Sequence, residues 1–390
     1  MHDELAGKSE SASPLMSTYG GYTTTIVSGD GCVLVDDHGR RYLDFLGGIS
    51  VVSLGHANNA IASALAEQAQ TLVHVSNFFA NPKALKLAEE IDLLLGGGGK
   101  VFFSNSGAEA NEAAIKLARR YGARERFEIV SAVNGFHGRT LGALAATGQP
   151  AKQDPFRPLP EGFLHVPFND LDAMREALDR PTVVAVLLET IQAEAGIIDP
   201  LPGYLEAVAE MARDRSVLFI IDEVQTGLCR TGRWFGFEHF GLSPDIVTMA
   251  KALGNGVPIG ATWAKSSVAQ AFQPGDHGTT FGGGALASAA ALAVLGEMKR
   301  LDLAERTASM GEYLRSALRL LPGVRALSGR GLLVGVELSE PRAQEVAKRA
   351  LEAGLIVNAL SADRLRLAPP LIVSTEEIDA AVTILRSVLT

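Results

Sequence analysis

The sequence is poor in cysteine and carries no excess of basic residues. Only Cys32 and Cys229 occur among its 390 residues, far apart and without metal-ligand spacing, so neither a disulfide framework nor a zinc site has support. The formal net charge of −9 provides no basic surface for nucleic acid and little attraction to anionic lipid. We therefore expect no metal, no nucleic-acid partner, and work on small molecules in a reducing cytoplasm.

An export signal and a membrane span are also missing. The first fourteen residues carry acids where a secretory signal needs a basic start and an apolar stretch, so we expect no export. Residues 278–296 lack charge over a length that raises the membrane question, but this run opens with threonines and three consecutive glycines. We expect a glycine loop that leads into a buried helix, and no membrane partner.

The chain has the length and the composition of a compact α/β protein with two or three domains. Hydrophobic residues make up 47% and charged residues 20%, which is typical of globular rather than disordered chains. Between residues 100 and 250 short apolar runs alternate with turns and helical patterns, which predicts a mostly parallel sheet flanked by helices. The predicted strands are 100–103, 127–130, 183–188, 217–221 and 245–250.

After residue 300 the pattern changes and predicts a smaller α+β domain. It consists of a helix (303–320), a turn, short strands around 332–337 and a second helix (342–354). Residues 31–46 are typical of a hairpin that turns at Asp37-His38-Gly39 and packs on this domain. The expected parts are an N-terminal segment (1–48), a large cofactor-binding domain (49–300) and a small C-terminal domain (301–390).

Polar residues follow the predicted strands, and ligands of open α/β sheets bind at the edge where parallel strands end. Ser106, Gly107 and Ala108 follow the first strand and begin a helical pattern with acids early and bases late. Their N–H groups and the Ser106 hydroxyl would form a phosphate cradle. An ordinary helix cap by Ser106 is an equally good interpretation of this motif alone.

Of the other predicted strands, one is followed by an acid, Asp222, and another is followed by a lysine, Lys251. A carboxylate buried at Asp222 is costly unless it meets a cation, and a protonated pyridine nitrogen is such a cation. Desolvation at Lys251 lowers the pKa of its amine and leaves it free to attack an aldehyde. A helix cap or ion pair for Asp222 and a surface-directed side chain for Lys251 are the alternatives.

A phosphate cradle, a ring acid and an imine-forming lysine on one sheet are the parts that pyridoxal 5'-phosphate (PLP) requires. We therefore predict PLP as the cofactor, held by Lys251 as a Schiff base. Phe136 would stack on the ring next to His137, Val224 would pack on the other face, and Gln225 would bond the phenolic oxygen. Plain packing is the alternative for Val224 and Gln225.

Five long motifs resemble the class III aminotransferases, and the resemblance covers nearly the whole chain. They are SNSGAEANEAAIKLAR, FHGRTLGALAATGQP, DEVQTGLCRTG, PDIVTMAKALGNGVPIGA and HGTTFGG. Within this class LGGISVVSLGH, LVHVSNFF and RLAPPLIV most resemble the acetylornithine aminotransferases. Ornithine, succinylornithine and GABA aminotransferases are close relatives of that group.

The resemblance implies fold type I of the PLP-dependent transferases, in a homodimer whose active sites are shared between subunits. It implies that Lys251 and Asp222 are catalytic, and that Thr280 reaches the phosphate from the partner subunit. The substrate-binding residues that it implies are Arg139 for a carboxylate, Arg366 for the α-carboxylate of glutamate or 2-oxoglutarate, Glu194 as the cover of Arg366, and the loop residues Ser76 and Asn77.

The implied reaction is transamination between N-acetylornithine, or a related ω-amino compound, and 2-oxoglutarate, which gives the semialdehyde and glutamate in arginine biosynthesis. A site that admits two different amino compounds has a physical need for the Glu194 and Arg366 pair, because a substrate without a second carboxylate would leave one arginine unpaired. Other donors, a PLP aminomutase, decarboxylase or racemase, and a catalytically silent binding protein are the alternatives.

Several loop positions depart from the acetylornithine pattern and bear on the substrate more than on the reaction. Additional methyl groups at Ala193 and Ala195 would restrict backbone conformations around Glu194. The departures are Asn58, Asn59, Thr190, Ala193, Ala195, Gly284 and Ala285.

Overall fold

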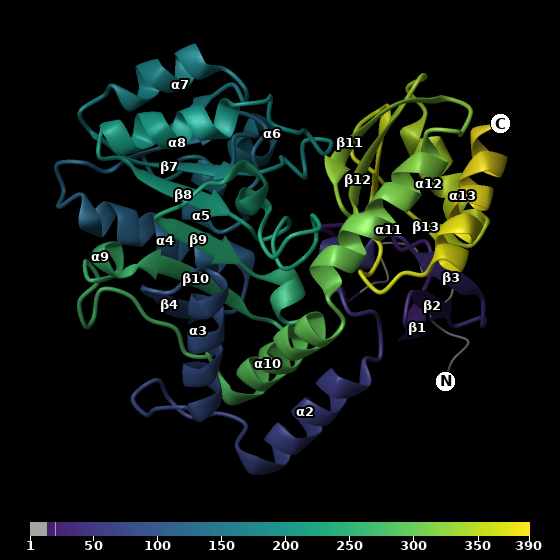
Figure 1. Ribbon diagram of the computed structural model, residues 1–390, viewed down its shortest axis with the longest axis horizontal. Helices are drawn as coiled ribbons and strands as arrows, with labels where there is room; N and C mark the ends of the chain where they lie inside the picture. The colour runs from purple at the N-terminus through teal and green to yellow at the C-terminus, as the bar shows by residue number, and fades with distance from the viewer. Residues whose placement is uncertain (1–13, 20) are drawn as a thin grey trace.

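The computed structural model describes residues 14–19 and 21–390, and a seven-stranded sheet forms its centre (Figure 1). The first thirteen residues, to which the expectation of no export mainly refers, lie outside the described part. The strand order is β4-β10-β9-β8-β7-β5-β6. These strands are β4 (Gly99–Ser104), β5 (Glu128–Ala132), β6 (Phe163–Val166), β7 (Val183–Glu189), β8 (Leu218–Asp222), β9 (Ile246–Met249) and β10 (Gly260–Lys265).

The sheet is mostly parallel, as predicted. Strands β5 to β9 pair in parallel, whereas β10 runs antiparallel to both of its neighbours, β4 and β9. The five predicted strands are present as β4, β5, β7, β8 and β9 with slightly shifted ends. The prediction missed β6 and β10, whose short runs include a histidine and a glycine and therefore show a weak strand pattern.

Helices cover both faces of this sheet because the side chains of each buried strand alternate between the two faces. Leu187 and Ile220 point to the face that α4 (Gly107–Tyr121) covers, whereas Leu188 and Ile221 lie on the other face. The remaining helices of this part are α2 (Asn59–Thr71), α3 (Pro82–Leu94), α5 (Leu141–Ala146), α6 (Pro150–Gln153), η2 (Asp154–Phe156), α7 (Leu171–Leu178), α8 (Tyr204–Asp214), η3 (Gly236–Phe240), η4 (Lys251–Leu253), α9 (Ser266–Ala269) and α10 (Ala285–Arg300).

The C-terminal part forms a second lobe of the molecule, on the right of Figure 1. A four-stranded sheet in the order β11-β12-β15-β14 packs against helices, as predicted for an α+β domain. Its elements are α11 (Leu303–Leu318), β11 (Val324–Arg330), β12 (Leu333–Leu338), α12 (Ala343–Glu352), β14 (Asn358–Ala359), β15 (Arg364–Leu367) and α13 (Thr375–Leu389).

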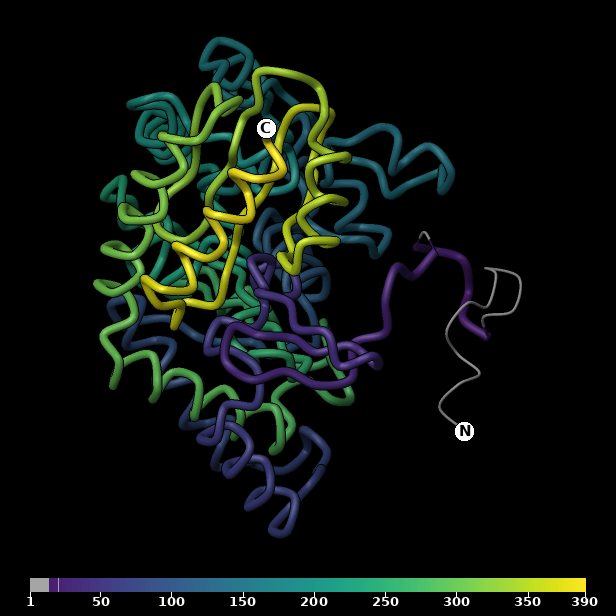
Figure 2. The backbone as a smooth tube through the Cα atoms, turned by 90° about the vertical axis from the view of Figure 1, so that its right-hand side faces the viewer, coloured from purple at the N-terminus to yellow at the C-terminus, as the bar shows by residue number. Residues whose placement is uncertain are grey.

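The predicted N-terminal hairpin is present and joins the C-terminal part (Figure 2). Strands β1 (Ile26–Asp30), β2 (Val33–Asp36) and β3 (Arg41–Asp44) are antiparallel, and β13 (Leu355–Ile356) adds to β3 in parallel. The chain then passes through α1 (Gly47–Ser50) into the large part. The domain boundaries at residues 48 and 300 remain our proposal.

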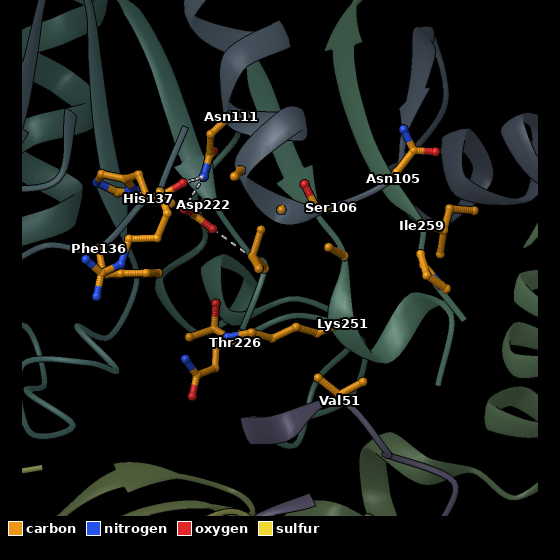
Figure 3. A pocket seen from close by; sticks show the side chains of 18 of the residues that line it. Val51, Asn105, Ser106, Asn111, Phe136, His137, Asp222, Thr226, Lys251 and Ile259 are labelled. Atoms are coloured by element: carbon orange, nitrogen blue, oxygen red, sulfur yellow. Dashed lines mark hydrogen bonds and ion pairs between the residues drawn. The ribbon is translucent and has the colours of Figure 1, made fainter. Parts of the chain in front are cut away.

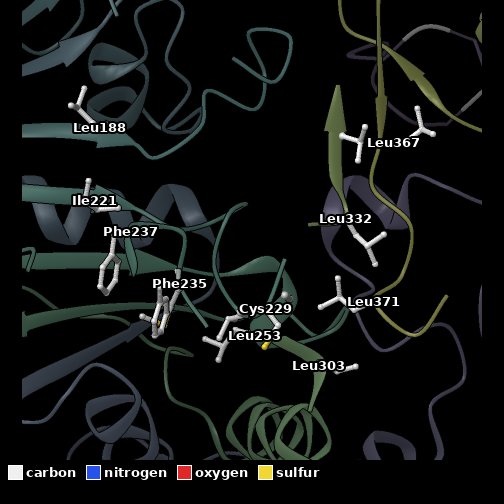
Figure 4. Close-up of a cluster of buried hydrophobic side chains, with 14 of the residues drawn as sticks. Leu188, Ile221, Cys229, Phe235, Phe237, Leu253, Leu303, Leu332, Leu367 and Leu371 are labelled. Atoms are coloured by element: carbon white, nitrogen blue, oxygen red, sulfur yellow. The ribbon is translucent and has the colours of Figure 1, made fainter. Parts of the chain in front are cut away.

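The charge-free run 278–296 forms a loop and most of α10, in line with the prediction. Within residues 14–19 and 21–390 no helix combines the length and the apolar character needed to cross a bilayer. One hydrophobic cluster continues from the large sheet into the C-terminal part. Figure 4 shows Leu188 and Ile221 at one end of it, and Leu332, Leu367 and Leu371 at the other.

Candidate active site

A cavity of about 380 Å³ opens at the carboxyl ends of the parallel strands (Figure 3). Glu189, Asp222 and Thr248 lie side by side there, because β7, β8 and β9 pair in register. The convergence of strand ends expected from the sequence is therefore present. The predicted residues that line the cavity are Ser106, Gly107, Ala108, Phe136, His137, Arg139, Asp222, Val224, Gln225 and Lys251.

Asp222 is buried and accepts three hydrogen bonds, which leaves Oδ1 able to accept one more. Its Oδ2 accepts bonds from Nδ2 of Asn111 at 2.8 Å and Nδ1 of His137 at 2.9 Å, and its Oδ1 accepts one from the Val224 amide at 3.0 Å. These contacts hold the carboxylate in one orientation within the cavity wall (Figure 3). A carboxylate in this setting suits a protonated ring nitrogen.

The sequence analysis missed two residues that orient Asp222. Asn111 lies on the apolar face of α4, and its Oδ1 accepts a hydrogen bond of 2.8 Å from Oγ1 of Thr248. The Thr248 hydroxyl thereby fixes which end of the Asn111 amide faces the carboxylate. A single asparagine among buried alanines was the available signal, because a buried amide needs partners.

The amino end of α4 forms a cradle at the cavity. Ser106 caps the helix by accepting a bond of 3.2 Å from the Glu109 amide. Among the described residues no group accepts a hydrogen bond from the amides of Gly107 or Ala108. An added Cβ at Gly107 would lie 2.7 Å from Cγ1 of Val224, so only glycine fits there. Free amides at a helix start suit a phosphate.

Lys251 follows β9 in a strained backbone conformation, with a φ of 44°. Burial lowers the pKa of its amine from the ordinary value to about 8, with Glu194 raising it and Arg366 lowering it further. Within the described chain no side chain or carbonyl hydrogen-bonds its Nζ atom. The amine is therefore available to an aldehyde at the cavity.

Glu189 holds two loops of the site in place, a role that the sequence analysis did not assign. Its Oε1 accepts a bond of 2.9 Å from the Phe136 amide, and its Oε2 accepts one of 3.1 Å from the Ala193 amide. Burial raises the pKa of Glu189 to about 7.

The guanidinium carbon of Arg139 lies 5.8 Å from the centre of the Phe136 ring, which places Arg139 at the cavity edge.

Arg366 and Glu194 form an ion pair beside Lys251. Arg366 is 1% exposed, and its Nη1 donates to Glu194 and to Oε1 of Gln225 at 3.1 Å. Its Nη2 donates to Oδ1 of Asn358 at 2.9 Å. Burial opposes ionisation of Glu194, but Arg366 and Lys251 together hold the pKa of this carboxyl below its usual range. Glu194 is therefore ionised at neutral pH.

Gln225 faces this ion pair, whereas the sequence analysis expected its amide to bond a cofactor oxygen. Its Nε2 donates to Oε1 of Glu194 at 3.3 Å, and its Oε1 also accepts a bond of 3.4 Å from the Ser50 hydroxyl. The Nε atom of Arg366 is buried, and no hydrogen-bond acceptor for it lies in the described chain.

Five predicted residues do not line this cavity: Glu194 and Arg366, which form the ion pair described above, and the loop residues Ser76, Asn77 and Thr280. Asn77 donates from Nδ2 to the carbonyl oxygens of Thr279 at 3.0 Å and Gly282 at 3.3 Å, so the loop with Ser76 packs on the loop with Thr280. Thr280 is exposed. The single chain does not place these three loop residues in the cavity that Lys251 lines.

The two alanines that flank Glu194 occupy ordinary backbone conformations. Ala193 and Ala195 both have negative φ, while the left-handed positions of this loop are Gly196 and Ile197. The additional methyl groups are therefore compatible with the observed pairing of Glu194. Asn58 caps α2 by accepting bonds from two backbone amides.

Comparison with known proteins gives a consistent result over the whole length. The family model "Aminotransferase class-III" matches residues 17–389. The acetylornithine aminotransferase of Caldanaerobacter subterraneus subsp. tengcongensis is 49% identical over 383 residues, which cover 96% of this chain and 97% of that protein.

Two solved structures are similar in fold. The ornithine aminotransferase from Toxoplasma gondii ME49 has a TM-score of 0.91 at 33% identity, covering 96% of this chain and 92% of the other. The acetylornithine aminotransferase from Elizabethkingia anophelis has a TM-score of 0.84 at 32% identity, covering 96% and 95%.

Proposed function

The chain belongs to the class III aminotransferases, and on that premise we propose that it transfers the terminal amino group of N-acetylornithine to 2-oxoglutarate in arginine biosynthesis. The products would be N-acetylglutamate semialdehyde and glutamate. The protein is an enzyme and its cofactor is PLP. The observation that carries the proposal is the buried ion pair of Glu194 and Arg366 beside Lys251.

The residues at the strand ends fit PLP, and each has a chemical task. When bound, PLP supplies an aldehyde carbon that carries the amino group and a ring that takes up electrons. The amino end of α4 would hold the phosphate, and Asp222 would keep the ring nitrogen protonated. Phe136 and Val224 would enclose the ring. The Lys251 amine would hold the aldehyde and then move a proton from the carbon that bears the amino group.

The ion pair explains how one site accepts two substrates. Glutamate has two carboxylates, and Arg366 and Arg139 would each bind one of them. N-acetylornithine lacks a carboxylate near its reacting amine, so Glu194 would stay on Arg366 and neutralise it. Arg139 would then bind the distant carboxylate of the donor. Without Glu194, the buried guanidinium of Arg366 would face the uncharged part of the donor substrate. This would cost free energy, because the buried charge would have no partner.

We also propose that the enzyme is a homodimer in the cytoplasm, with Thr280 and the loop of Ser76 and Asn77 completing the partner's site. Large apolar side chains are exposed around these loops, and Phe78 and Phe281 are 93% and 66% exposed. Such a patch is typical of an interface between subunits. Both cysteines are unpaired and buried, which suits a reducing compartment.

The experiment that tests the donor is a panel of amines assayed with 2-oxoglutarate: N-acetylornithine, N-succinylornithine, ornithine, GABA and lysine derivatives. We expect the highest kcat/KM for N-acetylornithine. A higher value for ornithine, N-succinylornithine or GABA would assign the chain to that specificity instead. The Lys251→Ala variant is the control, since it removes the amine while leaving the substrate arginines in place.

The same assay separates transamination from other PLP reactions. An aminomutase, a decarboxylase or a racemase would consume the amine without 2-oxoglutarate. We expect turnover of the amine to stop after one equivalent per site when 2-oxoglutarate is omitted. Continued turnover without it would refute the proposed reaction.

A further inference from the structure

A buried arginine outside the cavity, Arg230, connects the loop after β8 to the strand that carries Arg366. Its side chain is 1% exposed. Its Nη1 donates to the carbonyl oxygens of Leu332 at 3.0 Å and Pro369 at 2.6 Å, and its Nη2 donates to the Ser53 hydroxyl at 3.3 Å. Three separate segments therefore meet at one guanidinium.

The two carbonyls lie at the ends of the paired strands that position Arg366. Leu332 directly precedes β12, and Pro369 follows two residues after the end of β15. Within this pair Gly335 lies opposite Arg366. Holding both carbonyls limits how far either strand moves relative to the large part, and so limits movement of the Arg366 backbone.

The loop that carries Arg230 also contacts the Arg366 side chain, through Gln225. Glu223, at the base of this loop, is 1% exposed and accepts bonds from the Thr226 hydroxyl at 2.7 Å and the Phe237 amide at 2.8 Å. These contacts make residues 223–237 a braced loop. This loop therefore contacts the side chain of Arg366 through Gln225, and it contacts the ends of the Arg366 strand pair through Arg230.

Within the described residues no carboxylate forms a direct ion pair with Arg230, and the buried Asp44 acts on its charge only through space. Burial lowers the pKa of Arg230 to about 9, so the guanidinium remains charged at neutral pH. An apolar side chain would leave the carbonyl oxygens of Leu332 and Pro369 without these donors, whereas the guanidinium satisfies both and joins the two strand ends to the loop. Leu332, Cys229 and Leu371 already form an apolar contact there (Figure 4).

We propose that Arg230 is a positioning residue for the substrate carboxylate site: it holds the Arg366 strand at the place where Arg366 meets the α-carboxylate of 2-oxoglutarate or glutamate. This inference rests on the proposed function. It differs from a general structural role because it predicts a defect in one half-reaction. The amino donor reacts while Glu194 covers Arg366, so its half-reaction does not use that position.

The test measures the two half-reactions separately in single-turnover experiments with purified holoenzyme. The PLP form is mixed with the amino donor, and the pyridoxamine phosphate form is mixed with 2-oxoglutarate, each over a range of concentrations. The variants are Arg230→Lys, which keeps the charge but places it on a single donor nitrogen, and Arg230→Gln, which removes the charge. We expect the apparent affinity for 2-oxoglutarate to fall by about tenfold, as for a small displacement of a binding group.

Arg306 offers a matched control. Its Nη2 donates to the carbonyl oxygens of Ile372 and Val373 at 3.0 Å each, further along the same segment. Arg306→Lys removes the same kind of contact without touching β12 or the carbonyl of Pro369. We expect this control to change both half-reactions by less than about twofold, because the strand that carries Arg366 stays held.

The outcomes are distinct. A loss confined to the 2-oxoglutarate half-reaction in the Arg230 variants supports the proposal. Equal losses in both half-reactions, no loss in either, or failure of both variants to yield folded holoenzyme would overturn it in favour of a structural role. A wild-type enzyme that does not react with 2-oxoglutarate would refute the proposed function itself, together with this inference.

Discussion

Burial has opposite effects on two kinds of group near the cavity. It lowers the pKa of the Lys251 amine to about 8, and it raises the pKa of the Glu189 and Glu223 carboxyls to about 7. In each case the low-polarity surroundings disfavour the charged form. The result is an amine that is partly neutral near physiological pH, which is the form that reacts with an aldehyde.

The lowered pKa of Lys251 predicts how the apoenzyme takes up PLP. The rate of recombination should rise with pH, with a midpoint near pH 8, and level off about one to two pH units higher, where nearly all of the amine is neutral. Free N-acetyl-lysine should keep gaining rate toward about pH 10.4. Stopped-flow absorbance of the imine measures both rates. Lys265→Ala removes another strand-end lysine and should leave the profile unchanged, whereas a wild-type midpoint near that of free lysine would contradict the prediction.

Glu223 predicts a pH dependence of stability. Its pKa is about 7 in the folded protein, against an ordinary value of 4.5 for an unfolded chain, so the folded state binds the additional proton between these values. Its contribution is complete below pH 4.5 and is lost as the pH rises through 7. Glu223→Gln should flatten this dependence, reducing the fall in Tm between pH 5 and 8 by about 2–4 °C.

Thermal unfolding of wild type and Glu223→Gln across that pH range measures the effect. Only the difference in slope matters, because the glutamine also changes the hydrogen bonds at every pH. Glu125→Gln, at an exposed position, is the control. Parallel curves for wild type and Glu223→Gln would show that Glu223 does not titrate in this window.

At the scale of elements, the amino end of α4 depends on a glycine. In Gly107→Ala the new Cβ would lie 2.7 Å from Cγ1 of Val224, so the start of the helix must move away from the loop after β8. Crowding of this kind costs about 1–3 kcal/mol. We expect the Kd for PLP to rise by about tenfold, measured by equilibrium titration of the apoenzyme. An unchanged Kd would show that the cradle does not hold the phosphate.

Gly296 in α10 gives the opposite expectation. No atom lies within 4 Å of an added Cβ, and the residue is exposed within a helix. Gly296→Ala should therefore stabilise the fold by about 0.5–1 kcal/mol through helix propensity. Chemical denaturation measures this gain, and PLP affinity should remain at the wild-type value. A destabilised variant would indicate that this face of α10 is covered in the assembled enzyme.

At the scale of the whole molecule, one chain contains the cofactor residues but leaves Thr280 exposed. If Thr280 acts across a dimer interface, two inactive variants should restore each other. In a heterodimer of Lys251→Ala and Thr280→Val, one site contains both native residues. We expect co-expressed, doubly tagged heterodimers to recover about half of the wild-type activity, since one of two equivalent sites is intact.

The controls are the two parent homodimers. Lys251→Ala should be inactive, and Thr280→Val should bind PLP weakly. Light scattering of the wild type should give the mass of a dimer. A heterodimer no more active than Thr280→Val would show that Thr280 does not complete the partner's site, and a monomeric wild type would refute the dimer.

The sequence by itself determined five of the seven strands of the central sheet and the edge at which the cavity opens. Strand ends can be recognised from local apolar runs, and parallel strands bring their carboxyl ends to one edge whatever residues come after them. Ser106, Asp222 and Lys251 could therefore be grouped without coordinates. The short strands β6 and β10 were not predicted, because four to six residues show too little hydrophobic periodicity.

Only the tertiary structure decided which groups these residues contact. Asn111 meets Asp222 across 111 residues of sequence, and Gln225 turns to Arg366 across 141 residues. The same holds for Arg230, because its sequence motif does not indicate the hydrogen bond to the carbonyl of Pro369. A hydrogen bond depends on angles and distances within a few tenths of an ångström, and local sequence patterns do not specify these. Burial, and with it the pKa of Lys251, follows from the same packing.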